Sequence, residues 1–505
     1  MRRSVWLLVL SAAAAAVLVG GSVPAPPLAA QQPDARRIVA SDLRVERLTS
    51  IASAAASDLA YVPGQVAVKF RRGTSIVGQA RALRGLRSRP APTRLRWVGD
   101  VAVLTDMSEP DPAILARQLR LQREVEWAEP VYLRRRRAIP NDPSYVSLQW
   151  NLNAIGMPAA WDIQPGAASG VTVALIDSGL TNVDDTLLLP TWNGTSIQEV
   201  PVVVGVNPDV ARDRIDPGFD FVFFSSGQPV IDFEGHGTHV AMTVGQEANN
   251  ALFGAGLAYG ARLMPLKACV GYWELQFVRS ARGTPGYHPF DDTGFCPSDA
   301  IAEAIRYAAD HGAQVINLSL SGPAASQVER EAITYAIGRG AVVVAAVGNG
   351  FEEGNPVEYP AGFGPEIQGL IAVGAVGRTL EHAFYSSTGS HVEVAAPGGD
   401  SRVAAPGTGR IWQTTLQFDD SLPGSATAPR FDRYEEVGLQ GTSMAAPHVS
   451  GLAAMIIAQG VTRPAYVERI ITRTARDLGD PGRDEQYGFG LVQARTAIFG
   501  MGLAR

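Results

Sequence analysis

The most informative stretch of this sequence is Gly441-Thr442-Ser443-Met444-Ala445-Ala446-Pro447-His448. A serine follows a flexible Gly-Thr pair, and the apolar residues from Val449 to Ile457 recur at helical spacing, which predicts a helix that begins at the serine. The first turn of a helix offers unpaired backbone N–H groups and the positive end of the helix dipole, both of which favour a developing negative charge. We therefore interpret Ser443 as a candidate nucleophile, which still needs a base because a serine hydroxyl is weakly nucleophilic.

Two upstream segments supply a base and an acid. Glycines flank His236 in Gly235-His236-Gly237-Thr238-His239, so the imidazole can approach a partner closely where a second helix begins. The β-branched, apolar run from Val171 to Ile176 predicts a buried parallel strand that ends at Asp177. Parallel sheets keep their chemistry at the carboxyl ends of their strands, which makes Asp177 a candidate partner for His236.

The order Asp177, His236, Ser443, with intervals of 59 and 207 positions, is the order of subtilisin. From about Pro140 to Gly490 the chain resembles the subtilases, the serine endopeptidases of the subtilisin family. The resemblance implies an α/β, subtilisin-like fold with a mainly parallel sheet flanked by helices. It also implies hydrolysis of peptide bonds in proteins or peptides through an acyl-enzyme, with no required cofactor. Asn349, which follows the apolar run Ala341–Val347, matches the oxyanion-hole side chain of the family.

The resemblance assigns substrate binding to four residues that follow an apolar run at 315–318: Ser319, Leu320, Ser321 and Gly322. In relatives this segment pairs with the substrate backbone, a mode that tolerates many sequences, and forms a wall of the primary specificity pocket. Relatives usually carry glycine where this chain has Ser321, so we expect a bulkier wall and poorer acceptance of very large residues. The alternative interpretation of this segment is an ordinary core strand with no role in substrate binding. Relatives also carry a glycine where this chain has Met242, in the predicted helix that begins at His236. The larger side chain is therefore expected to lie close to the base.

The amino terminus predicts export. A positive start at Met1–Arg3 precedes an apolar run at Val5–Val19 and a small-residue exit at Pro27–Ala30, so residues 1–30 read as a signal peptide. An uncleaved membrane anchor is the alternative, but the run is short for a bilayer span. We expect a secreted or periplasmic product with no membrane anchor after signal removal.

The chain contains two cysteines, Cys269 and Cys296, and export permits a disulfide between them. The alternative is two unpaired, small apolar side chains. Residues 270–297 form a long insertion relative to the family, which either extends substrate selectivity or only covers the surface. Residues 398–437 form a second, loop-rich excursion, in which Ile411–Thr415 is the only strand-like part.

Charge separates two further parts of the chain. Residues 31–137 carry 20 Lys and Arg against 11 Asp and Glu, whereas residues 138–505 carry 21 against 38. The basic part lacks an aromatic stacking surface, so we do not expect a nucleic-acid partner. Its pattern predicts strands at 65–70 and 125–132, helices at 75–86 and 112–121, and a hairpin at 94–105. This resembles the α+β, ferredoxin-like propeptide of subtilases, which serves as folding template and intramolecular inhibitor.

We therefore divide the chain into a signal peptide (1–30), a propeptide (31–137) and a peptidase domain (138–505). The exposed basic run Arg134–Arg137 and the proline-rich segment after it are suited to cleavage. The run is alternatively a solvated charge cluster, with an autocatalytic cut just after Tyr132 or Leu133. Alternation of apolar runs at 262–267, 315–319, 341–346 and 370–376 with helical patterns at 297–311, 326–339, 442–459 and 463–474 predicts a parallel sheet between helix layers.

Metal binding is weakly indicated. Relatives hold a structural calcium ion in a loop after the histidine helix, where Asn249 and Asn250 resemble its ligands, but the loop is one residue longer here and we leave the metal open. Zinc spacing is absent, and His239 and His448 are interpreted as packing groups. We expect a monomer.

Three functions compete at this point: a secreted, self-processing endopeptidase of modest selectivity, a processing protease with one target, and a non-catalytic relative that binds peptides. Retention of Asp177, His236, Ser443 and Asn349 together argues against the binding protein, because peptide binding does not need all four. An acid-acting serine-carboxyl peptidase is disfavoured, because that class replaces the histidine with a glutamate.

Overall fold

The computed structural model describes residues 61–86, 95–106, 109, 111–132, 139–167, 170–192, 195–222, 229–282, 294–403, 407–417 and 430–499. The predicted signal peptide and the Arg134–Arg137 run lie outside these residues. The chain divides into two compact units, residues 1–134 and 135–505.

The first unit is a small antiparallel sheet with two helices. Its elements follow the chain order β1 (Tyr61–Phe70), α2 (Ile76–Ala82), β2 (Arg96–Val98), β3 (Val101–Thr105), α3 (Pro112–Arg120) and β4 (Val125–Tyr132), and its sheet order is β2-β3-β1-β4. This β-α-β-β-α-β order is the ferredoxin-like arrangement. One face of the sheet and both helices enclose an apolar core that includes Val66, Leu104 and Leu115.

The second unit is built on a seven-stranded sheet in the order β13-β12-β11-β10-β5-β9-β8. Every neighbouring pair in it is parallel. The strands are β5 (Thr172–Asp177), β8 (Phe219–Asp220), β9 (Arg262–Lys267), β10 (Val315–Leu318), β11 (Val342–Ala346), β12 (Leu370–Val376) and β13 (Val394–Pro397). The five predicted strand ranges agree with β5, β9, β10, β11 and β12 to within a residue.

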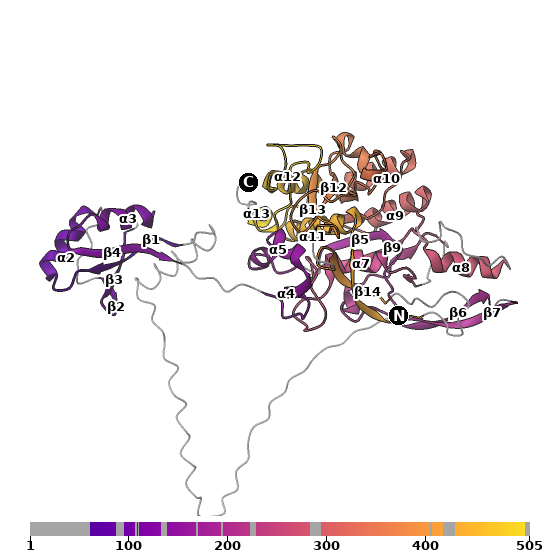
Figure 1. The fold of residues 1–505 in the computed structure, drawn as a ribbon, viewed down its shortest axis with the longest axis horizontal. Helices are drawn as coiled ribbons and strands as arrows, with labels where there is room; N and C mark the ends of the chain where they lie inside the picture. The colour runs from indigo at the N-terminus through magenta and orange to yellow at the C-terminus, as the bar shows by residue number, and fades with distance from the viewer. Residues whose placement is uncertain are drawn as a thin grey trace, which may run out of the picture. The chain divides into compact units, whose positions relative to one another are not determined.

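Helices cover both faces of this sheet (Figure 1). One layer holds α7 (His236–Gly245), α11 (Thr442–Ala458), α12 (Pro464–Thr474) and α13 (Ala494–Phe499), and the other holds α9 (Ser298–Asp310) and α10 (Gln327–Gly338). Successive residues of β5 alternate between the two layers: Val173 and Leu175 pack in the first core, Ala174 and Ile176 in the second. A strand buried on both faces explains the continuous apolar runs in the sequence, and the predicted α/β architecture is confirmed.

The sequence did not predict β8 and β13 of this sheet, nor several elements outside it. A long hairpin of β6 (Asp185–Trp192) and β7 (Ile197–Val204) follows the Asp177 turn, and α8 (Tyr272–Ala281) lies inside the predicted insertion. The prediction of a single strand in residues 398–437 was wrong. β14 (Ile411–Leu416) pairs antiparallel with β16 (Tyr434–Leu439), and β15 (Arg430–Phe431) pairs with β7. The sequence did not predict β16 because Tyr434–Glu436 are polar and the strand is only half-buried.

Candidate active site

Asp177 lies at the carboxyl end of β5, between β9 and β10, and is 3% exposed. Its Oδ1 accepts hydrogen bonds from His236 Nδ1 at 2.7 Å and from the backbone N–H of Ser178 at 2.7 Å. These two contacts fix both the position of the carboxylate and the rotation of the imidazole. With Nδ1 donating to Asp177, the other ring nitrogen, Nε2, is the one that can accept a proton.

His236 is the first residue of α7, and the glycines around it have steric reasons. Gly235 has φ +93°, and a Cβ on Gly237 would lie 2.3 Å from the carbonyl oxygen of Gly179. The close approach of α7 to the turn after β5, which brings His236 to Asp177, therefore requires glycine at 237.

Asp232, which the sequence analysis missed, organises the start of α7. Its fully buried carboxylate accepts hydrogen bonds from the backbone N–H groups of Gly235 and Thr238 at 2.9 Å each, and from Ser178 Oγ at 3.0 Å. A carboxylate at a helix N-terminus satisfies donors that have no partner within the helix. An acidic residue four positions before a predicted helix start was the available signal.

The charges around His236 favour its protonated form. Burial acts to lower the pKa of His236, but the Asp177 carboxylate, with smaller contributions from Glu234 and Asp232, raises it to about 9. Burial also raises the pKa of the Glu234 carboxyl to about 7. The imidazole keeps 30% of its side-chain surface exposed, so it is accessible to another molecule.

Ser443 is the second residue of α11, as predicted for a helix that begins beside it. Its carbonyl oxygen accepts a hydrogen bond from Ser319 Oγ at 2.7 Å. α11 packs against α7 in the same core. The helix that carries Ser443 therefore lies beside the helix that begins with His236.

Asn349 follows β11 and lies against the turn that precedes Ser443. Its Oδ1 accepts hydrogen bonds from the backbone N–H and the hydroxyl of Thr442, at 2.9 and 3.0 Å. These bonds occupy the oxygen of the amide and leave Nδ2 available as a donor. A Cβ built on Gly441 would lie 3.6 Å from that Nδ2, so the free donor borders the entrance to α11.

The model of the subtilase family matches residues 168–490 of this chain. The chain belongs to the subtilase family. It is 31% identical over 430 residues to the thermophilic serine proteinase of Bacillus sp. (strain AK1), which covers 85% of this chain and 86% of that protein. It is 31% identical over 360 residues to thermitase of Thermoactinomyces vulgaris, which covers 71% of this chain and 99% of thermitase.

A solved structure also supports membership of the subtilase family. A protease from Pseudoalteromonas arctica is similar, with a TM-score of 0.52 and 27% identity over 72% of this chain and 99% of that chain. These findings identify the chain as a serine-type endopeptidase with a subtilisin-like fold. No helix among the described residues of this subtilase is long and apolar enough to cross a membrane.

The first residue of the predicted substrate segment, Ser319, contacts the residue proposed as nucleophile. The last residue, Gly322, pairs with the backbone of another loop. Ser319 is buried and donates to Ser443, as noted above. At the other end, the N–H and C=O of Gly322 pair with the backbone of Tyr359, at 2.9 and 2.8 Å. The backbone of Gly322 is thus already engaged, and any pairing with a substrate falls on the residues before it.

The two residues that resemble calcium ligands, Asn249 and Asn250, are held in this subtilase by two buried carboxylates, Asp209 and Asp142. The oxygens of the buried Asp209 accept hydrogen bonds from the side-chain amides of Gln246 and Asn250, at 2.6 and 2.5 Å. Asp142 accepts from the backbone N–H groups of Asn249 and Asn250, at 2.8 and 3.1 Å. Both carboxylates thus accept hydrogen bonds from the loop that follows α7. In the described residues no group of three or more His, Cys, Asp or Glu could hold a metal ion.

The other two histidines of the motifs are packing groups in this structure. Burial lowers the pKa of His239 to about 3 and that of His448 to about 4. His239 Nε2 lies 3.1 Å from the carbonyl oxygens of Ile411 and Val437, which ties α7 to the β14–β16 hairpin.

The insertion of this subtilase is attached firmly to the strand beside Asp177. Cys269 and Cys296 form a disulfide that closes it at its base. Inside it, Glu274 of α8 forms a buried ion pair with Lys267 at 2.6 Å, and Lys267 Nζ also donates to the carbonyl oxygen of Ser178. Lys267 is the register partner of Asp177 across β5 and β9. The insertion therefore braces the strand end that carries the acid.

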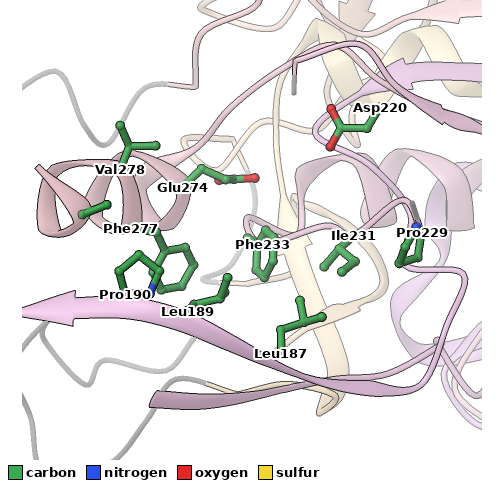
Figure 2. Close-up of a pocket in the computed structure, with 11 residues that line it drawn as sticks. Leu187, Leu189, Pro190, Asp220, Pro229, Ile231, Phe233, Glu274, Phe277 and Val278 are labelled. Atoms are coloured by element: carbon green, nitrogen blue, oxygen red, sulfur yellow. The ribbon is translucent and has the colours of Figure 1, made fainter. Parts of the chain in front are cut away.

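An apolar pocket of 370 Å³ lies between α8 and the β6 strand. Figure 2 shows Leu187, Leu189, Phe233 and Phe277 facing this space, with Glu274 above them. None of the residues that line it belongs to the predicted catalytic or substrate-binding sets.

Proposed function

We propose that this subtilase is exported as a precursor and that its mature part hydrolyses peptide bonds with Asp177, His236 and Ser443 as catalytic triad. The observation that carries the proposal is the 2.7 Å hydrogen bond between Asp177 Oδ1 and His236 Nδ1, at the start of a helix that packs beside the Ser443 helix. A buried acid that orients a histidine is the arrangement that activates a serine hydroxyl.

The reaction follows from the roles of these groups. His236 accepts the proton of the Ser443 hydroxyl at Nε2 as the oxygen attacks the scissile carbonyl, and Asp177 stabilises the imidazolium that forms. The oxyanion is stabilised by Asn349 Nδ2 and by the backbone N–H of Ser443. His236 then returns the proton to the leaving amine, which leaves an acyl-enzyme, and a water molecule releases the acyl group by the same steps.

The two amino-terminal parts of the chain, residues 1–30 and 31–137, support the proposal that the enzyme is made as a precursor. The basic segment 31–137 contains a separately folded unit with ferredoxin-like topology, and residues 138–505 carry an excess of acidic residues. Complementary charge favours association of the two. We infer that the segment acts as an intramolecular inhibitor until it is cut off, and that residues 1–30 direct export to the periplasm or the medium, as in relatives such as the extracellular protease of Xanthomonas campestris.

Kinetics of two variants test the catalytic assignment. Ser443→Ala should abolish hydrolysis of a peptide substrate, because it removes the nucleophile. Asn349→Ala should lower kcat by about 100- to 1,000-fold with little change in KM, a magnitude known from subtilisin itself. A loss that appears mainly in KM would contradict the oxyanion role of Asn349.

A further inference from the structure

A carboxylate lies between two segments that border the proposed cleavage position. Glu358 Oε2 accepts a hydrogen bond from Ser321 Oγ at 2.6 Å, and its Oε1 accepts one from Ser387 Oγ at 3.3 Å. Ser321 belongs to the predicted substrate segment. The side chain of Ser321 therefore holds this carboxylate in place, beyond adding bulk to the pocket wall.

The backbone fixes Glu358 at this position. The next residue, Tyr359, exchanges both of its backbone hydrogen bonds with Gly322, the last residue of the substrate segment. Glu358 and Ser321 are thus brought together by backbone pairing as well as by their side chains.

The same carboxylate reaches the loop that carries Asn349. A Cβ built on Gly348, which has φ +103°, would lie 2.2 Å from Glu358 Oε1, and one built on Gly350 would lie 3.1 Å from it. The absence of a side chain at Gly348 gives the carboxylate room. Glu358 therefore touches both neighbours of the proposed oxyanion donor.

This placement decides what Glu358 can contact, given the proposed function. The substrate residue whose carbonyl is attacked has its carbonyl oxygen at Asn349 and its backbone along residues 319–321. Its side chain must project between the substrate segment and the 348–350 loop. The Glu358 carboxylate lies between these two segments, so a long side chain at this position meets it.

The charge of Glu358 is not balanced by a lysine or arginine that the structure describes. His391 interacts with this carboxylate, but burial lowers the pKa of the imidazole and favours its neutral form. The two hydrogen-bond donors to Glu358 are neutral hydroxyls, and no Lys or Arg within the described ranges forms an ion pair with it. The residue is half-buried, where a charge interacts more strongly than at an open surface. A half-buried carboxylate without a counter-ion favours a cationic ligand and penalises an acidic one.

We propose that Glu358 determines the primary specificity of this subtilase and that the enzyme cleaves after a cationic residue, arginine or lysine. The chain offers such a site in its own precursor, because Arg134–Arg137 forms the end of the basic segment, directly before the peptidase domain. The proposal thus selects this run, over a cut after Tyr132 or Leu133, as the processing site.

Matched peptide substrates test the proposal on the mature enzyme. Two fluorogenic peptides that differ only in arginine or leucine at the cleaved position give the preference as a ratio of kcat/KM. Wild type should prefer arginine, and Glu358→Gln should reduce that ratio by about 10- to 100-fold, the effect of one charged hydrogen bond. Glu303→Gln, which removes an exposed carboxylate on α9, is the control and should keep the wild-type ratio.

Two further measurements keep the outcome decisive. In wild type, benzamidine should inhibit cleavage of the arginine peptide, whereas benzamide, its neutral analogue, should not. Labelling of Ser443 by a fluorophosphonate shows whether the triad is active, whichever substrate residue the enzyme prefers.

An enzyme that is labelled but shows no arginine preference, or a Glu358→Gln variant that is labelled and keeps the preference, overturns the specificity role of Glu358. Absence of labelling in mature wild type overturns the proposed triad, and this inference with it.

Discussion

At the scale of single residues, the protonation of His236 links the structure to a measurable rate. Only neutral imidazole can act as the base, so kcat/KM should rise as the pH passes the pKa of His236. The neighbouring carboxylates raise that pKa to about 9. We therefore expect the rise of kcat/KM with pH to occur at a higher pH than the ordinary pKa of an imidazole would give.

Glu234 supplies a specific test of this electrostatic account. Its charge is one of those that raise the pKa of His236. Glu234→Gln should therefore lower that pKa and move the rising limb of kcat/KM to lower pH, so that the relative rate near neutral pH increases. Glu303→Gln should leave the limb in place, because that exposed carboxylate is on α9. A limb that stays fixed or moves to higher pH in Glu234→Gln would refute the role of Glu234.

Residues close together in a motif were predictable, and contacts between distant segments were not. The glycines around His236 and the helical spacing after Ser443 are local patterns, and they predicted α7 and α11 correctly. Glu358 lies 37 positions from Ser321, and no local pattern marks their contact. The role of Asp232 likewise depends on a turn that brings Ser178 to α7.

At the scale of elements, five strands of the sheet were predictable because each is buried on both faces and reads as a continuous apolar run. β13 and the two-residue β8 were not predicted. The β6–β7 hairpin and β16 were missed, since they are partly exposed and their apolar residues are interrupted. α8 was missed inside an insertion for which relatives offer no pattern. Of these elements, β6 and α8 line the apolar pocket, and α8 braces the Asp177 strand end through Glu274.

The disulfide should stabilise this peripheral region. It closes a loop over a sequence separation of 27 residues, for which the loss of chain entropy corresponds to about 3.5 kcal/mol. In an inactive Ser443→Ala background, which prevents autolysis, Cys269→Ser should therefore lower the free energy of unfolding in urea. Cys296→Ser and the double variant should lower it by about the same amount, because all three lose one bond. Unchanged urea midpoints would show that the bond contributes nothing.

At the scale of the whole molecule, the sequence predicted two oppositely charged parts, and the structure contains two compact units whose boundary along the chain falls at the predicted processing site. The family explains the peptidase domain. The opposite charges of the two parts support the proposal that the basic part acts as an inhibitor of the acidic enzyme. With Glu358 in the proposed specificity pocket, the Arg134–Arg137 run becomes a substrate of the enzyme that follows it.

The most direct test is the intact mass of the exported protein before and after reaction with a fluorophosphonate. The account predicts a chain shortened to the region of Arg134–Arg137 that gains one adduct, located on Ser443 by peptide mapping. The exported Ser443→Ala protein should keep residues 31–137 and stay unlabelled. A shortened wild-type chain without an adduct, or normal processing of Ser443→Ala, would contradict an active, self-processing serine endopeptidase.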